Sequence, residues 1–328
     1  MSIIKERRKI NKAIRHAKTI FIMAHKDLDL DALGSSIGMI QFLKKKRKKV
    51  YLIIDDKIHE LGVEKILREL DGCLNIIRSE HIDENLNPNE KNNLLIILDT
   101  NKTELVQSEL ALKKINNKLV IDHHDLGKTT IKNCIMINDN KTSSTCEMIT
   151  NLIEYYDIEI DSYYATILLS GIVLDTNNFT LNTTSETFYA SYYLTSLGAS
   201  AKKVQYLLKQ DINEYTEREK LLSSIETIDN KIAITKASSS TQYRREDLAK
   251  VADTLLFFNN IEASFVIGKI GKETVGISAR SLGSYDITNI LTKLGGGGDT
   301  YGGAAVFTDT TIGNVEKELK RLIKEEGE

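Results

Sequence analysis

Residues 19–31 read TIFIMAHKDLDLD, and this stretch decides the fold. The apolar run at 19–23 predicts a buried strand. The segment that follows brings His25, Asp29 and Asp31 to the carboxyl edge of the sheet to which that strand belongs. Carboxylate and imidazole groups at such an edge suit a hard divalent metal ion.

The same arrangement recurs along the chain. Apolar runs at 94–98, 119–121 and 167–174 lead directly into Asp99, the triplet Asp122-His123-His124, and Asp175. A single Asp after a strand is usually a turn or helix-capping residue. There are four such junctions, and one of them has two adjacent imidazoles. Helix capping alone therefore does not explain why acidic and imidazole residues recur after the apolar runs. The sequence therefore predicts a metal site.

The spacing of the apolar residues predicts an α/β fold in which a parallel sheet carries helices on both faces. Strands are expected at 19–23, 50–54, 74–77, 94–98 and 119–121. Helices are expected at 3–17, 31–43, 63–70, 143–156 and 162–173. The segment 82–93 holds the only proline among polar residues and is expected to be a surface loop.

Three regions are expected: a metal-binding domain at 1–195, a helical linker at 196–229, and a smaller α+β domain at 230–328. The smaller domain follows from short strands predicted at 231–235, 263–267 and 274–278. A helix at 287–294 precedes four glycines, 295–298. Four consecutive glycines are costly in conformational entropy, so we expect a loop whose backbone N–H groups approach an anion or a base. Arg280 would be the nearby cation.

The composition limits the class of protein. The 328 residues include 44 Lys and Arg against 46 Asp and Glu, a near balance that argues against a surface for long nucleic acids. Three cysteines without paired spacing suit a reducing cytoplasm. The charged N-terminus is unlike a signal peptide, and no apolar run reaches the ~20 residues that span a bilayer. We expect a cytoplasmic protein with no membrane segment in this chain.

These motifs resemble the DHH phosphoesterase superfamily over nearly the whole chain. The resemblance lies in the triplet at 122–124, HxxxDxD at 25–31, Asp-Thr at 99–100, SSTCE at 143–147 and GIVLDT at 171–176. SARSLGS at 278–284 and KLGGGG at 293–298 are most similar to the catalytic half of GdpP-type cyclic-di-AMP phosphodiesterases. Proteins of that type usually carry membrane helices and sensor domains upstream, so the chain is either a stand-alone enzyme or a catalytic part.

The resemblance implies a site with two manganese ions. One ion would be held by His25, Asp29 and Asp99, and the other by Asp31, Asp99, His123 and Asp175, so that Asp99 is shared. A hydroxide activated by both ions would open a cyclic dinucleotide to its linear 5′-phosphorylated form.

The resemblance also implies roles in catalysis and substrate binding. Asp122 would orient an imidazole, His124 would touch the phosphate or pass a proton, and Arg280 would clamp a phosphate. Substrate contacts would come from Ser143, Ser144, Ser278, Arg280, Gly296, Gly297 and Gly298. The partner is expected to be a small cyclic or linear dinucleotide, bound in the cleft between the two domains of the chain. The resemblance also implies a homodimer.

Two positions depart from the family pattern. Asp299 stands where a histidine usually follows the glycines, and Asp125 replaces an arginine after the triplet. Both changes weaken the assignment of the substrate more than the assignment of the metal ligands. Hydrolysis of very short RNA or linear dinucleotides and removal of phosphate from 3′-phosphoadenosine 5′-phosphate are alternative activities. A catalytically weak nucleotide-binding protein is the alternative from another class.

Overall fold

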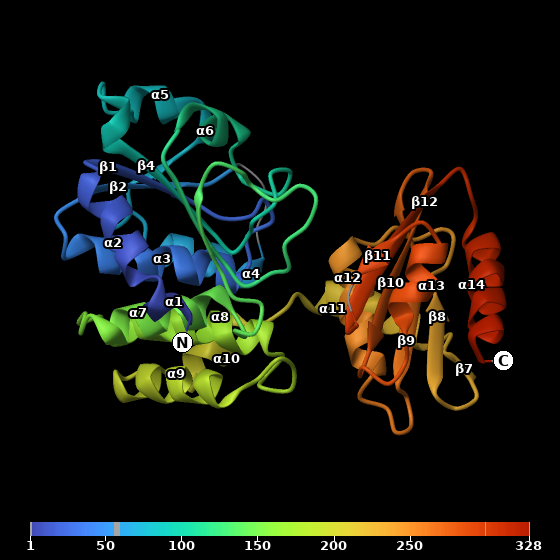
Figure 1. The fold of residues 1–328 in the computed structure, drawn as a ribbon. Helices are drawn as coiled ribbons and strands as arrows, with labels where there is room; N and C mark the ends of the chain where they lie inside the picture. Colours follow the sequence, from blue (N-terminus) through green and yellow to red (C-terminus); the bar gives the residue numbers. More distant parts are fainter. Residues whose placement is uncertain (1, 56–59, 299, 328) are drawn as a thin grey trace. The chain divides into compact units, whose positions relative to one another are not determined.

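The computed structural model describes residues 2–55, 60–298 and 300–327, and the chain divides into two compact units, 1–209 and 210–328 (Figure 1). The point of division lies inside the segment 196–229, which the sequence suggested as a linker. The three-part division itself stays a prediction.

The first unit is built on a six-stranded parallel sheet in the order β3-β2-β1-β4-β5-β6. Its strands are β1 (Thr19–Met23), β2 (Lys49–Ile53), β3 (Ile76–Ile77), β4 (Asn93–Leu98), β5 (Lys118–Asp122) and β6 (Ile135–Asn138). The chain progresses outward from β1 on one side and from β4 on the other. The carboxyl ends of strands at such a reversal are the usual ligand-binding position in open α/β sheets.

Helices cover both faces of this sheet, as the sequence predicted (Figure 1). They are α1 (Ser2–Lys5), α2 (Arg7–His16), α3 (Leu30–Lys44), α4 (Leu61–Glu69), α5 (Ile82–Asn85), α6 (Glu109–Lys114), α7 (Thr145–Tyr155), α8 (Ser162–Asp175), α9 (Ser185–Ser196) and α10 (Ala201–Leu207). Ile20 and Ile22 of β1 belong to the core that includes α3, α7 and α8, whereas Phe21 and Met23 belong to the core beside α5 and α6. Alternate residues of one strand thus serve two cores, which is why the run is continuously apolar.

Two local expectations need correction. The helix expected at 3–17 is interrupted at Glu6, which separates α1 from α2. The segment 82–93 is not simply a loop, because α5 occupies its first four residues and a 3-10 turn spans Glu90–Asn92. Ile82 explains the first of these elements, since its side chain is fully buried in the core beside β1 and β4.

The second unit contains a mixed six-stranded sheet in the order β11-β12-β10-β9-β8-β7, in which β8 and β9 are parallel and the other neighbours antiparallel. Its strands are β7 (Glu226–Ile228), β8 (Ile232–Lys236), β9 (Ala263–Gly271), β10 (Thr274–Ser281), β11 (Gly297–Gly298) and β12 (Gly302–Thr308). Its helices are α11 (Ile212–Leu222), α12 (Arg245–Leu255), α13 (Ile287–Lys293) and α14 (Ile312–Gly327). In the described part of the chain, no helix is both long and apolar enough to span a membrane.

The strand register assigns each face of this second sheet to its helices (Figure 1). Ser264 of β9 donates its hydroxyl hydrogen to the Ala252 carbonyl of α12, and Arg280 of β10 is the register partner of Ser264. Arg280 therefore lies on the face covered by α12. A Cβ on Gly303 of β12 would lie 2.4 Å from Leu291 of α13, so the opposite face is covered by α13.

The four glycines do not form the expected loop. Residues 297–298 form β11, which pairs with β12. A Cβ on Gly296 would lie 2.3 Å from the Ala304 carbonyl oxygen, and a Cβ on Gly298 would lie 2.3 Å from the Gly302 carbonyl oxygen. Side chains at these two positions would prevent β11 from approaching β12, so close strand packing explains much of the run.

Candidate metal centre

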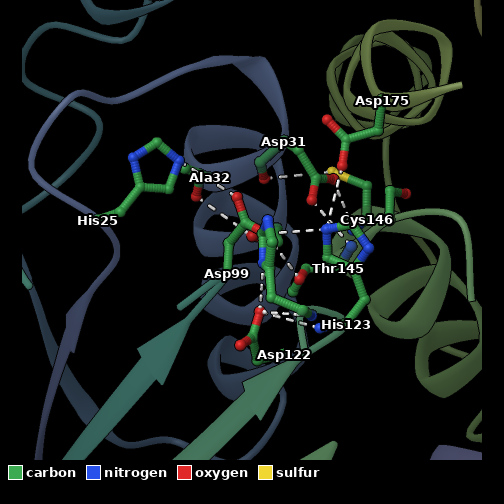
Figure 2. A network of polar contacts seen from close by, with 12 residues as sticks. His25, Asp31, Ala32, Asp99, Asp122, His123, Thr145, Cys146 and Asp175 are labelled. Atoms are coloured by element: carbon green, nitrogen blue, oxygen red, sulfur yellow. Dashed lines mark hydrogen bonds and ion pairs between the residues drawn. The ribbon is translucent and has the colours of Figure 1, made fainter. Parts of the chain in front are cut away.

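Six acidic and imidazole side chains converge at the carboxyl edge of the first sheet (Figure 2). His25 and Asp29 follow β1, Asp31 lies in the first turn of α3, Asp99 follows β4, His123 follows β5, and Asp175 ends α8. Their donor atoms form one group of His25, Asp29 and Asp99 and another of Asp31, Asp99, His123 and Asp175, each within 4.8 Å. These are the two groups that the resemblance implied, and the sharing of Asp99 between them is a feature of the geometry.

Asp99 lies at the centre of the arrangement, with one carboxylate oxygen toward each group. Its Oδ2 is 3.3 Å from His25 Nε2, its Oδ1 is 3.4 Å from His123 Nε2, and Oδ1 also accepts a hydrogen bond of 3.0 Å from Thr145 Oγ1. The residue has a φ of 57°, in the left-handed region that a non-glycine residue seldom adopts. Such backbone strain, held at the end of a buried strand, is common at functional sites.

Asp31 is held by the N-terminus of α7. Its Oδ2 accepts from Thr145 N and its Oδ1 from Cys146 N, both at 2.8 Å, and its side chain is completely buried. The partial positive charge of a helix N-terminus favours a carboxylate at this position. Because α7 lies far along the chain from α3, these bonds tie the first motif to the SSTCE motif.

Asp29 has both a structural and a site-facing oxygen. Its Oδ1 caps α3 by accepting from the backbone N–H groups of Asp31 and Ala32, each at 2.9 Å. Its Oδ2 lies 3.5 Å from His25 Nε2. The Asp29 side chain can therefore cap α3 with one oxygen and belong to the donor group of His25 and Asp99 with the other.

The chemistry of the donor set fits divalent metal ions. His123 Nε2 is buried and, among the described residues, has no hydrogen-bond partner, although it lies 3.2 Å from Asp175 Oδ2 and 3.4 Å from Asp99 Oδ1. A buried ring nitrogen without a partner is costly, and a cation between it and the carboxylates would satisfy all three groups.

The electrostatics of the site lead to the same conclusion. Burial raises the pKa of Asp31 well above its usual value, and the charges of Asp99 and Asp175 raise it further. Burial also raises the pKa of Asp175 to about 6, although the nearby His123 ring lowers it. Burial lowers the pKa of His25, but Asp29 and Asp99 outweigh that effect and leave it well above the usual value. Crowded carboxylates of this kind can ionise together when a bound cation offsets their repulsion.

Asp122 orients the second histidine of the triplet. Its Oδ1 accepts from His124 Nδ1 at 2.8 Å and from the backbone N–H of His123 at 2.9 Å. Its Oδ2 accepts from Asn101 Nδ2 at 2.5 Å, and the same amide group donates to the His124 carbonyl at 3.2 Å. The bond at Nδ1 leaves Nε2 of the half-exposed His124 ring directed away from Asp122.

Sequence reasoning missed Asn101 and Thr145. Both adjoin residues that were recognised, since Asn101 follows the Asp-Thr pair and Thr145 lies inside SSTCE. The pattern gave no indication of their partners, because Asn101 reaches a carboxylate on β5 and Thr145 reaches one that follows β4.

Ser143 and Ser144 were expected to contact substrate, which stays a prediction, and the structure shows that both bond to Glu147 at the start of α7. Ser143 Oγ donates to Glu147 Oε2 at 2.6 Å, and Ser144 Oγ accepts from Glu147 N at 3.0 Å as the N-cap of α7. Both side chains are buried. The pair fixes the start of the helix that holds Asp31, so their effect on the site passes through that helix.

The second unit holds the other residues expected to bind substrate. Arg280 forms an ion pair with Asp253 of α12, with 2.7 Å between Nε and Oδ1. Ser278, two residues earlier on β10, is buried on the same face of the sheet. Gly297 has open space where a Cβ would be, unlike Gly296 and Gly298. Asp299 lies outside the described residues.

Comparisons with known proteins agree with this geometry. Residues 19–172 match the model of the DHH family, N-terminal domain. The chain is 36% identical over 321 residues to the cyclic-di-AMP phosphodiesterase GdpP of Geobacillus thermodenitrificans (strain NG80-2), which covers 96% of this chain and 48% of that protein. It is 35% identical over 321 residues to the cyclic-di-AMP phosphodiesterase PdeA of Listeria monocytogenes serotype 1/2a (strain 10403S), which covers 94% of this chain and 48% of that protein. The chain thus spans about half the length of these relatives.

A solved structure shares the fold. The crystal structure of an exopolyphosphatase-related protein from Bacteroides fragilis has a TM-score of 0.78 to this chain and covers 97% of it, with 96% of its own length matched. Only 22% of the aligned residues are identical, so the likeness concerns the fold alone.

Proposed function

We propose that the chain is a metal-dependent phosphodiesterase of the DHH family, because residues 19–172 match the model of the DHH family, N-terminal domain. Its proposed reaction is hydrolysis of cyclic-di-AMP, or of a related cyclic dinucleotide, to the linear 5′-phosphorylated dinucleotide. The observation that carries the proposal is the pair of donor groups that share Asp99. The identity of 36% to a cyclic-di-AMP phosphodiesterase supports the choice of substrate.

The six ligands are proposed residue by residue. His25, Asp29 and Asp99 would hold one ion, and Asp31, Asp99, His123 and Asp175 the other. Two divalent ions held in this way supply a Lewis acid for the phosphoryl oxygens and lower the pKa of a bound water molecule. Manganese is our proposed metal, because mixed carboxylate and imidazole donors suit it and no cysteine belongs to either group.

We propose proton-handling and substrate-binding roles for the other residues of the chain. His124 has Nδ1 fixed by Asp122, so its Nε2 is the atom that would exchange a proton with the reacting phosphate or the leaving oxygen. Asp122 keeps that ring in one tautomer and orientation. In the second unit, Arg280 would bind a phosphate. Ser278 lies two residues earlier on the same strand, β10, and Gly297 lies on β11, which pairs with β12, the strand next to β10. These roles in proton transfer and substrate binding are separate from the metal ligands and are tested by separate substitutions.

A homodimer and a cytoplasmic setting remain proposals. The three cysteines are free thiols, which agrees with a reducing compartment. Light scattering of the purified chain would measure the oligomeric state, and a monomeric mass at micromolar concentration would remove the dimer from the account.

The test is a hydrolysis assay with and without manganese. We expect turnover of cyclic-di-AMP that chelation abolishes and that Asp99→Ala reduces by at least 1000-fold, because this substitution removes one ligand from both donor groups. Glu159→Ala is the matched control, since its carboxylate is 91% exposed and remote from both groups. The control should retain wild-type turnover.

The same assay separates the alternatives. Linear dinucleotide, very short RNA and 3′-phosphoadenosine 5′-phosphate are offered in parallel with the cyclic substrate. Faster turnover of any of these would replace the proposed substrate. Binding of nucleotide without manganese-dependent turnover of any substrate would contradict the proposed enzyme and favour a binding protein.

A further inference from the structure

The ion pair between Asp253 and Arg280 lies within the second unit, and the recognised motifs do not explain it. We propose that Asp253 is a positioning residue, which holds the Arg280 guanidinium in the orientation that binds a substrate phosphate. The inference rests on the proposed function, because it assigns a role to Arg280 within that function. Asp253 lies on α12, 27 residues before Arg280 in sequence, and belongs to none of the recognised motifs.

Two hydrogen bonds, and the space left by a neighbouring glycine, fix the Arg280 side chain. Nε donates to Asp253 Oδ1 at 2.7 Å, and Nη1 donates to the Ala279 carbonyl at 2.9 Å. On the neighbouring strand, a Cβ on Gly302 would lie 3.3 Å from Nη1 and 3.5 Å from Cζ, so the absence of a side chain there makes room for the guanidinium. A long side chain with several rotamers is therefore held in one conformation before any ligand binds.

These contacts leave one edge of the guanidinium for a ligand. Among the described residues, Nη2 of Arg280 has no protein hydrogen-bond partner, and the Arg280 side chain is 25% exposed. Arginine binds phosphate best through two adjacent N–H groups of its planar fork. Because Asp253 holds the Nε side, the Nη side faces outward before the ligand arrives. Less conformational entropy is then lost when a phosphate binds.

The energetics argue against a purely structural ion pair. Burial raises the pKa of Asp253, and although Arg280 lowers it, the pKa stays above its usual value. Arg280 therefore offsets the burial of this carboxylate only in part. An ion pair whose attraction does not offset its desolvation contributes little to stability, so a role in orienting the arginine is the better explanation for the acid.

Steady-state kinetics with cyclic-di-AMP and manganese test the proposal. We expect Asp253→Ala to raise KM about 10-fold at nearly constant kcat, because loss of a group that acts on binding alone appears in KM, and because misplacing a positioned group can cost up to about 100-fold. Asp253→Asn keeps a hydrogen-bond acceptor and should give a smaller rise. In the Arg280→Ala background, Asp253→Ala should add less than about a twofold change, since residues that act through one contact are not additive.

A matched control lies on the same helix. Asp247 of α12 is also paired with arginines, Arg244 and Arg218, and Arg280 is not among the residues with which it forms an ion pair in the described part of the chain. Asp247→Asn removes an ion pair from α12 without touching Arg280, so KM should stay within twofold of the wild type. A KM that rises equally in Asp247→Asn and Asp253→Ala would mean that α12 acts by general stability, and would overturn the proposal.

A spectroscopic measurement keeps the inference testable apart from turnover. The Arg280 Nε–H signal in a ¹H–¹⁵N spectrum should exchange slowly with water in the wild type and quickly in Asp253→Ala. If the wild type shows no activity, the proposed function fails whatever this signal does. If the wild type is active and Asp253→Ala changes neither KM nor the signal, the inference alone is wrong.

Discussion

Asn101 shows how a single buried amide can organise a site that it does not enter. Its side chain is 1% exposed and joins the Asp122 carboxylate to the backbone carbonyl of His124. Asn101 follows β4, whereas Asp122 ends β5 and His124 follows it, so the amide connects the ends of adjacent strands.

Replacing this amide tests the role proposed for His124. We expect Asn101→Ala to lower kcat by about 10- to 100-fold, as outer partners of metal-site residues typically do, while manganese affinity changes little because Asn101 contacts no proposed ligand side chain. Kinetics at saturating manganese and a metal titration measure the two effects. Asn85→Ala, which removes an exposed amide, is the control. A loss of metal affinity equal to the loss of kcat would contradict the assignment.

The six proposed ligands could be predicted from the sequence because their physical cause is local. His25, Asp29, Asp99 and His123 follow strands whose carboxyl ends meet at one edge, whereas Asp31 begins α3 and Asp175 ends the apolar helix α8. Ser143 and Ser144 could not be assigned in this way. A serine before a helix can cap that helix or contact a ligand, and the sequence does not show the bonds that Ser143 and Ser144 form with Glu147.

At the scale of elements, β11 and β12 explain the glycine run. Gly295 needs its φ of 76°, and Gly296 and Gly298 need the absence of a Cβ, whereas Gly297 faces open space. Sequence alone indicates that a glycine is required, but not which of these requirements applies.

A pair of substitutions tests this explanation. We expect Gly296→Ala to destabilise the second unit by about 1–3 kcal/mol, because overpacking costs roughly that amount. Gly297→Ala should change the free energy of unfolding by less than about 0.5 kcal/mol, as most surface substitutions do. Denaturant unfolding of both variants measures the difference. Equal effects would show that steric contact with β12 is not the reason for the run.

The ion pairs of α12 make a prediction about pH. Burial raises the pKa of Asp247, but Arg244 and Arg218 lower it more, so the folded pKa lies below the usual value. A depressed pKa adds stability at pH values above the unfolded pKa, and that stability is lost as pH falls through the folded pKa. We therefore expect Asp247→Asn to cost about 1.5–3 kcal/mol at pH 7, the range for hydrogen bonds to charged groups.

The cost of Asp247→Asn should begin to shrink below about pH 4, where the unfolded carboxyl takes up a proton, and should disappear once the pH falls below the folded pKa. Urea unfolding of the wild type and the variant at pH 7, 5 and 3 measures this dependence. A cost that stays constant across the three pH values would mean that the charge of Asp247 does not contribute.

At the scale of the whole molecule, the account depends on residues from distant parts of the first unit meeting around Asp99. Four segments, from residue 25 to residue 175, contribute donor atoms to two groups. The sequence predicted this convergence, but not the strained backbone of Asp99 or the helix N-terminus that holds Asp31, because both arise only when the sheet and α7 are packed together.

Anomalous X-ray scattering from crystals of the chain soaked in manganese is the most direct test of the central claim. The account predicts two manganese peaks per chain on opposite sides of the Asp99 carboxylate, one beside His25 and one beside His123, and the loss of both in Asp99→Ala. A single peak, or two peaks that persist in Asp99→Ala, would contradict it.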